Sequence, residues 1–145
     1  MENNPYQAPE SDLRIEEKFK RSLWWKIYFF FITLFSGLGF VPILASPEAG
    51  ISEYLLLLLW VIATVGLFGF VFLKPVYKPA FWLQILEVYI LFTVTYYFTT
   101  QVDMRMGMSE SAYYISNAIG WLISVPGYYA LYSYSKPTNP AWKNA

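Results

Sequence analysis

The chain contains no cysteine and no histidine, and only 14% of its 145 residues are charged. Without cysteine, disulfides, thiolate nucleophiles and cysteine-based metal sites are excluded. Without histidine, the usual general base near neutral pH and the commonest metal ligand are both missing. No serine therefore has a histidine base, and no glycine-rich phosphate loop is present. We expect a protein that is not an enzyme, that holds no metal or other cofactor, and that binds no nucleic acid.

The residues that replace charge are apolar: 57% of the chain is hydrophobic and 21% is aromatic. They fall into four blocks separated by polar gaps, whereas a soluble domain carries about 25% charge throughout. About 20 apolar residues cross the ~30 Å hydrocarbon layer as a helix, and only a helix satisfies its own backbone there. The sequence predicts an all-α membrane protein with four transmembrane helices in an antiparallel bundle. The spans are expected near 23–45, 51–73, 80–100 and 112–134.

The segments outside the spans are short. Residues 1–22 form a polar N-terminal arm, of which 1–10 are expected to be disordered because they hold two prolines and few large apolar groups. Residues 12–24 fit either a helix lying on anionic headgroups or a solvated basic flank. No cleavable signal peptide is recognisable, so the first span is expected to be a retained anchor. Residues 135–145 are expected to form a cytoplasmic C-terminal tail.

The distribution of basic residues predicts the orientation of the chain. Only Arg105 falls in the third loop. In the predicted topology, the other nine of the ten Lys and Arg residues fall on the opposite side of the membrane. These nine are Arg14, Lys18, Lys20, Arg21, Lys26, Lys74, Lys78, Lys136 and Lys143. Since basic loops stay in the cytoplasm, both termini are expected there.

Small residues repeat along three of the predicted spans, at the spacing that lets helices in lipid approach closely. The set comprises Thr33 and Gly37 in the first span, Ala63, Gly66 and Gly69 in the second, and Ser116, Gly120, Ser124 and Gly127 in the fourth. They fit contacts within one bundle or with a partner protein. Pro126 in the fourth span predicts a kink and frees the carbonyl of Leu122.

Glu87 is the one acid deep inside a predicted span, in the stretch FWLQILEVYILF. It lies about eight residues past the start of the third span, or ~12 Å deep, where an ionised acid costs about 2.5–3.5 kcal/mol. Gln84 lies one turn earlier, and depth matching brings Ser124 and Tyr128 to the same level. Lys26 enters from the same side at a shallower depth. These five residues form the predicted intramembrane polar site.

Three interpretations of Glu87 remain open. A protonated Glu87 can fix helix register through a hydrogen bond to Ser124, Tyr128 or a backbone carbonyl. It can pair with a polar group of another membrane subunit, or it can bind a cation or relay a proton. The leading hypothesis for the whole chain is a small accessory or assembly subunit that binds another membrane protein, or itself, through helix faces. The alternative is a minimal transporter or ion- or proton-conducting oligomer centred on Glu87.

The opening NPYQAP, residues 4–9, resembles the NPYxAP leader of small bacterial inner-membrane proteins of unassigned role. The leader is also similar to that of some members of the RDD membrane family, although no Arg-Asp-Asp triplet occurs in this chain. The resemblance implies a bacterial cytoplasmic (inner) membrane and a cytosolic leader. It implies no catalytic residue.

Overall fold

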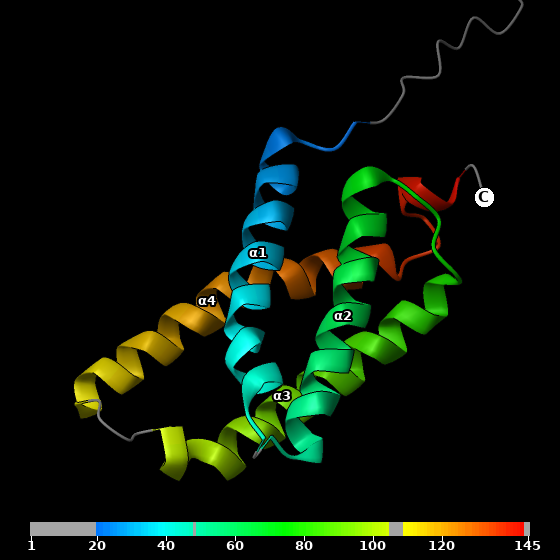
Figure 1. Cartoon of the computed structure of the whole chain (residues 1–145). Helices are drawn as coiled ribbons and strands as arrows, with labels where there is room; N and C mark the ends of the chain where they lie inside the picture. The colour runs from blue at the N-terminus through cyan, green and yellow to red at the C-terminus, as the bar shows by residue number, and fades with distance from the viewer. Residues whose placement is uncertain (1–19, 48, 105–108, 144–145) are drawn as a thin grey trace, which may run out of the picture.

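The structure, a computed structural model, describes residues 20–47, 49–104 and 109–143 (Figure 1). Its helices are α1 (Leu23–Ala45), α2 (Ile51–Phe72), α3 (Pro79–Met104), α4 (Glu110–Tyr134) and the short 3-10 helix η1 (Pro140–Trp142). No strand occurs among the described residues, so the all-α prediction is confirmed. The predicted disordered leader, most of the helix expected at 12–24, and Arg105 lie outside the described residues.

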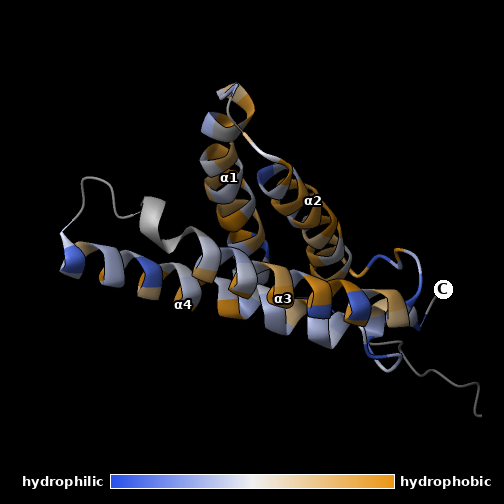
Figure 2. Cartoon of the chain, turned by 90° about the horizontal axis from the view of Figure 1, so that it is seen from below, coloured by the Kyte–Doolittle hydropathy of each residue, from blue (hydrophilic) through white to orange (hydrophobic). Residues whose placement is uncertain are grey.

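Three of the helices are long and apolar enough to cross a membrane. Their candidate spans are Leu23–Pro42 in α1, Ile51–Phe72 in α2 and Pro79–Thr99 in α3. The fourth helix, α4, has 25 residues and is therefore long enough, but it is more polar. Figure 2 shows this contrast, with α1 and α2 mostly hydrophobic and hydrophilic residues spread along α4. The chain is thus a membrane-embedded helical protein with at least three candidate spans.

Local sequence signals determine where these helices begin and end. Helix α3 begins at Pro79, a residue whose missing N–H costs nothing in the first turn. The Ser109 side chain accepts a hydrogen bond from the Ala112 backbone N–H and so caps α4. Helix α2 ends at Leu73, which adopts the left-handed conformation with φ 54°, and the Lys74 N–H then donates to the Gly69 carbonyl at 3.0 Å.

The helices form two hairpins that meet at one end and diverge at the other (Figures 1 and 2). Helix α2 is central, because it packs against α1, α3, α4 and η1, while α3 and α4 also pack against each other. The sequence predicted a compact antiparallel bundle, and the diverging hairpins differ from it. The difference has a physical cause: the large buried side chains Phe70, Trp82 and Tyr134 all lie at the converging end.

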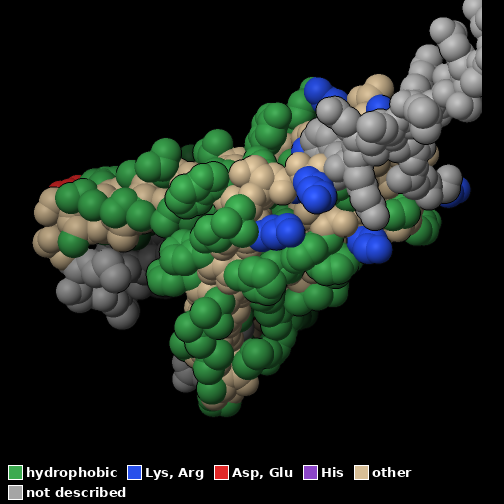
Figure 3. Space-filling model, turned by 90° about the horizontal axis from the view of Figure 1, so that it is seen from above, with side chains coloured by type: hydrophobic (Ala, Val, Ile, Leu, Met, Phe, Trp, Pro, Cys, Tyr) green, Lys and Arg blue, Asp and Glu red, His purple; other side chains and the backbone are tan. Residues whose placement is uncertain are grey.

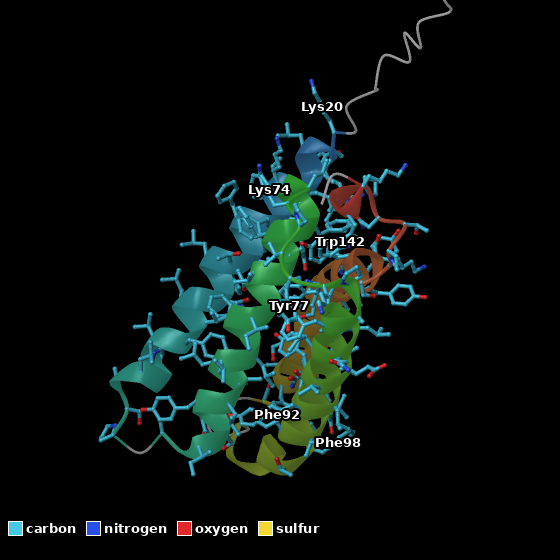
Figure 4. All side chains as sticks on the ribbon, turned by 90° about the vertical axis from the view of Figure 1, so that its right-hand side faces the viewer. Lys20, Lys74, Tyr77, Phe92, Phe98 and Trp142 are labelled. Carbon is cyan, nitrogen blue, oxygen red and sulfur yellow. The ribbon has the colours of Figure 1, made fainter. Side chains whose placement is uncertain are left out.

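We call this converging end the junction and define it by six residues from different parts of the chain. They are Arg21 before α1, Phe70 at the end of α2, Trp82 at the start of α3, Tyr134 at the end of α4, and Asn139 and Trp142 in the C-terminal tail. Figure 4 shows Trp142 of the tail at the same end of the molecule as Lys20 and Lys74. The predicted C-terminal tail is therefore not a free extension, because it folds back onto the helix ends.

Aromatic hydrogen bonds hold the junction together. The Tyr134 hydroxyl donates to the Lys74 carbonyl at 2.5 Å and accepts from the Val76 N–H at 2.8 Å. The Trp82 indole donates to the Val76 carbonyl at 2.6 Å, and the Trp142 indole donates to the Tyr134 carbonyl at 2.6 Å. The loop between α2 and α3 thus has backbone groups of Lys74 and Val76 satisfied by side chains from α3 and α4.

Arg21 joins the start of the described chain to the tail. Its Nε donates to the Phe70 carbonyl at 3.2 Å, and its Nη2 donates to Asn139 Oδ1 at 3.2 Å. The guanidinium also lies 3.8 Å from the centre of the Phe70 ring, a cation–π contact. Burial lowers the pKa of Arg21 from its ordinary value, yet an arginine stays protonated at neutral pH.

Two glycines of α2 make the close approach of the helices possible. A Cβ placed on Gly66 would lie 2.6 Å from both the Trp82 ring and Leu131 Cδ2. A Cβ on Gly69 would collide with the Tyr134 hydroxyl. Both predicted packing positions therefore lie against large junction side chains, and Ala63, one turn before Gly66, is also buried.

The remaining small residues fall into two groups. Gly127 lies against the Tyr28 hydroxyl, 2.9 Å from the position of a Cβ, and Gly37 lies against Trp60 at 3.5 Å. A Cβ on Gly120, by contrast, would meet no described atom within 4 Å. Of the other predicted packing residues, Thr33 and Ser124 are half-buried and Ser116 is exposed. The first half of α4 therefore presents its small residues to an open surface.

The contrast between Gly66 and Gly120 gives a matched test of the packing. We expect Gly66→Ala to lower the free energy of unfolding by about 1–3 kcal/mol, because the methyl group overpacks Trp82 and Leu131. Gly120→Ala is expected to leave it unchanged or to raise it by up to about 1 kcal/mol, because alanine favours a helix. Denaturation with SDS in mixed micelles, followed by circular dichroism, measures both. Equal stability of the two variants would contradict the close contact at Gly66.

Tyr134→Phe tests the hydrogen bonds of the junction. The variant leaves the Lys74 carbonyl and the Val76 N–H without their partner, and we expect a loss of about 1–3 kcal/mol in the same assay. Tyr132→Phe is the control, because Tyr132 is exposed on the same helix and its ring is retained. A loss of the same size in the control would show that the junction bonds do not carry the effect.

Candidate functional site

Helix α3 presents Gln84 and Glu87 on the side that faces away from the other helices. Gln84 and Glu87 are exposed, and Leu91 and Thr95 continue the same stripe. At 100° per residue these four positions lie within one face, which we call the outer face of α3. The opposite face holds the buried or half-buried residues Trp82, Leu86, Tyr89 and Thr93.

Within the described part of the chain, neither Glu87 nor Gln84 forms a side-chain hydrogen bond or an ion pair. Both lie inside the candidate span Pro79–Thr99, with Glu87 ~12 Å from its start. A carboxyl and a carboxamide at that depth find no water to replace the missing partners. The outer face of α3 thus carries two polar side chains that lack hydrogen-bond partners among the described residues.

The structure separates the five residues of the predicted polar site. Lys26 is exposed in the first turn of α1, and no ion pair joins it to Glu87 among the described residues. Ser124 is half-buried, and its hydroxyl donates within α4 to the Gly120 carbonyl at 2.9 Å. Tyr128 is half-buried and packs its ring against Tyr89, with the centroids 5.8 Å apart. Ser124 and Tyr128 therefore share one region, while Gln84, Glu87 and Lys26 do not reach it.

That shared region is a cleft of two hollows between the helices. The inner hollow, of about 70 Å³, receives residues from all four long helices. Its lining is Tyr28, Ile32, Ser36, Trp60, Ala63, Thr64, Leu67, Tyr89, Ser124, Gly127, Tyr128 and Leu131. The outer hollow, of about 240 Å³, lies between α3 and α4 and is lined by Thr93, Tyr96, Tyr97, Ser116, Asn117, Gly120, Trp121, Ser124 and Tyr128. Because Ser124 and Tyr128 line both hollows, the two adjoin.

Sequence reasoning missed most of this cleft. Tyr28, Tyr89 and Tyr128 come from three different helices, and of these the predicted polar site included only Tyr128. The signal that was available is the position of Tyr89, ten residues inside α3, which is too deep for an interface anchor. No charged residue lines either hollow.

Tyr28 also connects α1 to the proline of α4. Helix α4 continues through Pro126, and the Tyr28 hydroxyl donates to the Ile123 carbonyl at 3.0 Å. Ile123 directly follows Leu122, whose carbonyl was expected to lose its partner to the proline. Side chains of neighbouring helices commonly satisfy such groups near a proline in lipid. Tyr28 thereby ties α1 to α4 at one edge of the inner hollow.

The chemistry available in the cleft is that of neutral hydroxyl and aromatic groups. No cluster of acidic residues that could hold a metal ion occurs among the described residues. The described lining offers tyrosine, serine and threonine hydroxyls, an asparagine amide and flat aromatic rings. Such groups bind by hydrogen bonding and stacking. The outer face of α3 and the cleft are therefore two separate sites with different chemistry.

No protein-family model, no curated protein sequence and no solved structure matches the chain. The function is accordingly argued from the geometry of these two sites.

Proposed function

We propose that this protein is a small non-enzymatic membrane subunit that binds another membrane protein through the outer face of α3. The observation that carries the proposal is the outward orientation of Glu87 and Gln84, inside an apolar span and without a described partner. A partner helix that supplies hydrogen-bond donors to Glu87 would remove the cost of leaving these groups in lipid. Interhelical hydrogen bonds of this kind contribute about 0.6–2 kcal/mol each.

The rest of the outer face suits a helix–helix contact. Leu91 is 69% exposed and Phe98 is 70% exposed, so a partner finds large apolar side chains beside the two polar ones. A polar pair within an apolar stripe fixes register as well as affinity, because a shifted partner would leave the carboxyl unpaired. The partner's matching feature is a hydroxyl, amide or basic side chain at the depth of Glu87.

We further propose that α4 is a fourth span and that both termini are cytoplasmic. Arg21, just before α1, donates a hydrogen bond to Asn139, just after α4, so both chain ends lie at one end of the molecule. If α1, α2 and α3 each cross the bilayer, α4 must cross as well to return the chain to Asn139. The positive charges support the cytoplasmic assignment, because the described Lys and Arg side chains gather over that end (Figure 3).

The bacterial inner membrane completes the proposal, and it rests on the resemblance of the NPYQAP leader and on the same charge distribution. The alternative, a transporter or ion-conducting oligomer centred on Glu87, has less support. A conduction path through this chain would bring Glu87 to a polar passage between the helices. Glu87 instead faces away from the cleft, and the residues that line the cleft carry no charge.

Single-cysteine labelling tests the fourth span, and the chain suits it because it has no cysteine of its own. In intact cells, we expect a membrane-impermeant maleimide to label Ala49→Cys and Ser111→Cys, since both lie on the side opposite the junction. Lys78→Cys and Lys143→Cys are expected to react only after the membrane is permeabilised. Labelling of Lys143→Cys together with Ser111→Cys in intact cells would mean that α4 does not cross.

Site-specific photo-crosslinking tests the partner. A photoreactive phenylalanine replaces Leu91 on the outer face of α3 or, as the control, Leu122 on α4, which is 73% exposed and therefore equally accessible. We expect Leu91 to give one discrete adduct with a membrane protein and Leu122 to give none. Adding Glu87→Leu is expected to reduce the adduct at least tenfold, because the polar contact that selects the partner is gone.

Glu110→Gln is the matched charge control, because Glu110 is an exposed acid at the start of α4, far along the chain from the outer face of α3. This variant should keep the adduct. The proposal fails if Leu91 and Leu122 give the same adducts, or if Glu87→Leu leaves the adduct at Leu91 unchanged. An adduct with the mass of two copies of this chain would identify the partner as the protein itself.

A further inference from the structure

Three hydroxyl groups meet where the two hollows of the cleft adjoin. Tyr89 and Thr93 lie one turn apart on the inner side of α3, and Tyr128 faces them from α4. Thr93 and Tyr128 both line the outer hollow. We call these three residues the hydroxyl cluster, and it belongs to neither the junction nor the outer face of α3.

The hydroxyl cluster is short of hydrogen-bond partners. Among the described residues, Thr93 Oγ1 is fully buried and has no hydrogen bond of ordinary length and angle. The Tyr89 hydroxyl forms no hydrogen bond to a described residue either, although the Tyr89 ring packs against that of Tyr128. Threonines in membrane helices usually donate to a carbonyl one turn back, as Thr99 does to the Thr95 carbonyl at 3.0 Å. The cluster therefore holds donors that a bound acceptor would satisfy.

The chemistry of the lining restricts what that acceptor can be. Every residue of both hollows lies in a long helix, and those of α1, α2 and α3 lie inside the candidate spans. With α4 as the proposed fourth span, the ligand would arrive from the bilayer. A charged ligand would find no counter-charge there and would lose its hydration, so the ligand is neutral. Aromatic walls, which include Trp60 in the inner hollow and Trp121 in the outer one, fit a planar ring or an apolar chain.

We propose that the cleft binds a neutral lipid-soluble molecule through carbonyl oxygens that accept hydrogen bonds from Tyr89, Thr93 and Tyr128. A carbonyl oxygen accepts two such hydrogen bonds and donates none. It therefore suits a site whose hydroxyl groups act as donors. Two natural sources present this chemistry in a membrane: the ring of a quinone and the esters of an uncharged acylglycerol. The outer hollow, about 240 Å³, accommodates the attached chain, and the inner hollow adjoins the hydroxyl cluster.

Native mass spectrometry of the full chain, released from phosphatidylcholine nanodiscs, tests the proposal with two probes. One is a benzoquinone with a decyl chain and the other is 1,2-dioctanoylglycerol. We expect one of them to bind saturably with one molecule per chain. The double variant Tyr89→Phe/Tyr128→Phe, which removes hydroxyls and keeps both rings, is expected to weaken that binding about tenfold or more. Tyr132→Phe, on the exposed side of α4, is expected to bind like the original chain.

The melting temperature of the double variant separates binding from folding. Among the described residues, neither tyrosine hydroxyl forms a hydrogen bond to the protein backbone. The double variant should therefore melt no lower than the original chain. Should it fail to fold, Thr93→Val serves in its place, because it removes the third hydroxyl at nearly constant volume and is expected to weaken binding several-fold. The proposal is overturned if neither probe binds saturably, a result that would indicate a cleft filled by water alone. It is also overturned if removal of the hydroxyls leaves the affinity for the probe unchanged.

Discussion

The arrangement of the helices depends on one hydroxyl group. The loop between α2 and α3 turns back at the junction, where the Tyr134 hydroxyl bridges the carbonyl of Lys74 and the N–H of Val76. Trp82 satisfies the other polar group of Val76, and Gly69 leaves the space in which the tyrosine lies. Because these two hydrogen bonds join the Tyr134 side chain to the backbone just after α2, they hold the end of α4 against the end of α2. The C-terminal tail and Arg21 then complete the same junction.

The divergence of the two hairpins follows from where the large side chains lie. Aromatic rings fill the junction, whereas farther along the helices Gly120 and Ser116 meet an open surface. Helices in lipid gain nothing from hiding apolar surface from each other, since the lipid chains are equally apolar. Without close packing or hydrogen bonds to hold them, the ends away from the junction have no reason to close. The inner hollow of the cleft, which is lined by residues of both hairpins, is the consequence.

The sequence predicted the helices well because the hydrocarbon thickness imposes their length and their apolar composition. It also indicated Glu87 and Gln84 as unusual, since acids and amides in a span are costly wherever they face. The sequence could not predict whether the side chains of Glu87 and Gln84 face the other helices or face away from them. A soluble helix shows its buried side through its apolar stripe, but a membrane helix is apolar all round, and the face of α3 that meets α2 is decided by Trp82 fitting over Gly66. Tyr28 and Tyr89 were missed for a related reason, because they converge with the predicted Tyr128 only once three helices are placed.

Helix α3 carries the carboxyl group of Glu87 on one face and the hydroxyl groups of Tyr89 and Thr93 on the opposite face, and the two kinds of group require different hydrogen-bond partners. The carboxyl of Glu87 needs a strong donor or its own proton, and it lies on the outer face, where another chain can supply what this one does not. The hydroxyls of Tyr89 and Thr93 need only a neutral acceptor, and they lie on the opposite face, inside the cleft. The reverse placement would bury a carboxyl among groups that include no basic side chain, at a cost of several kcal/mol. Under the two proposals, the same helix would bind a protein partner outward and a neutral ligand inward, and the junction would keep the two faces in fixed relation.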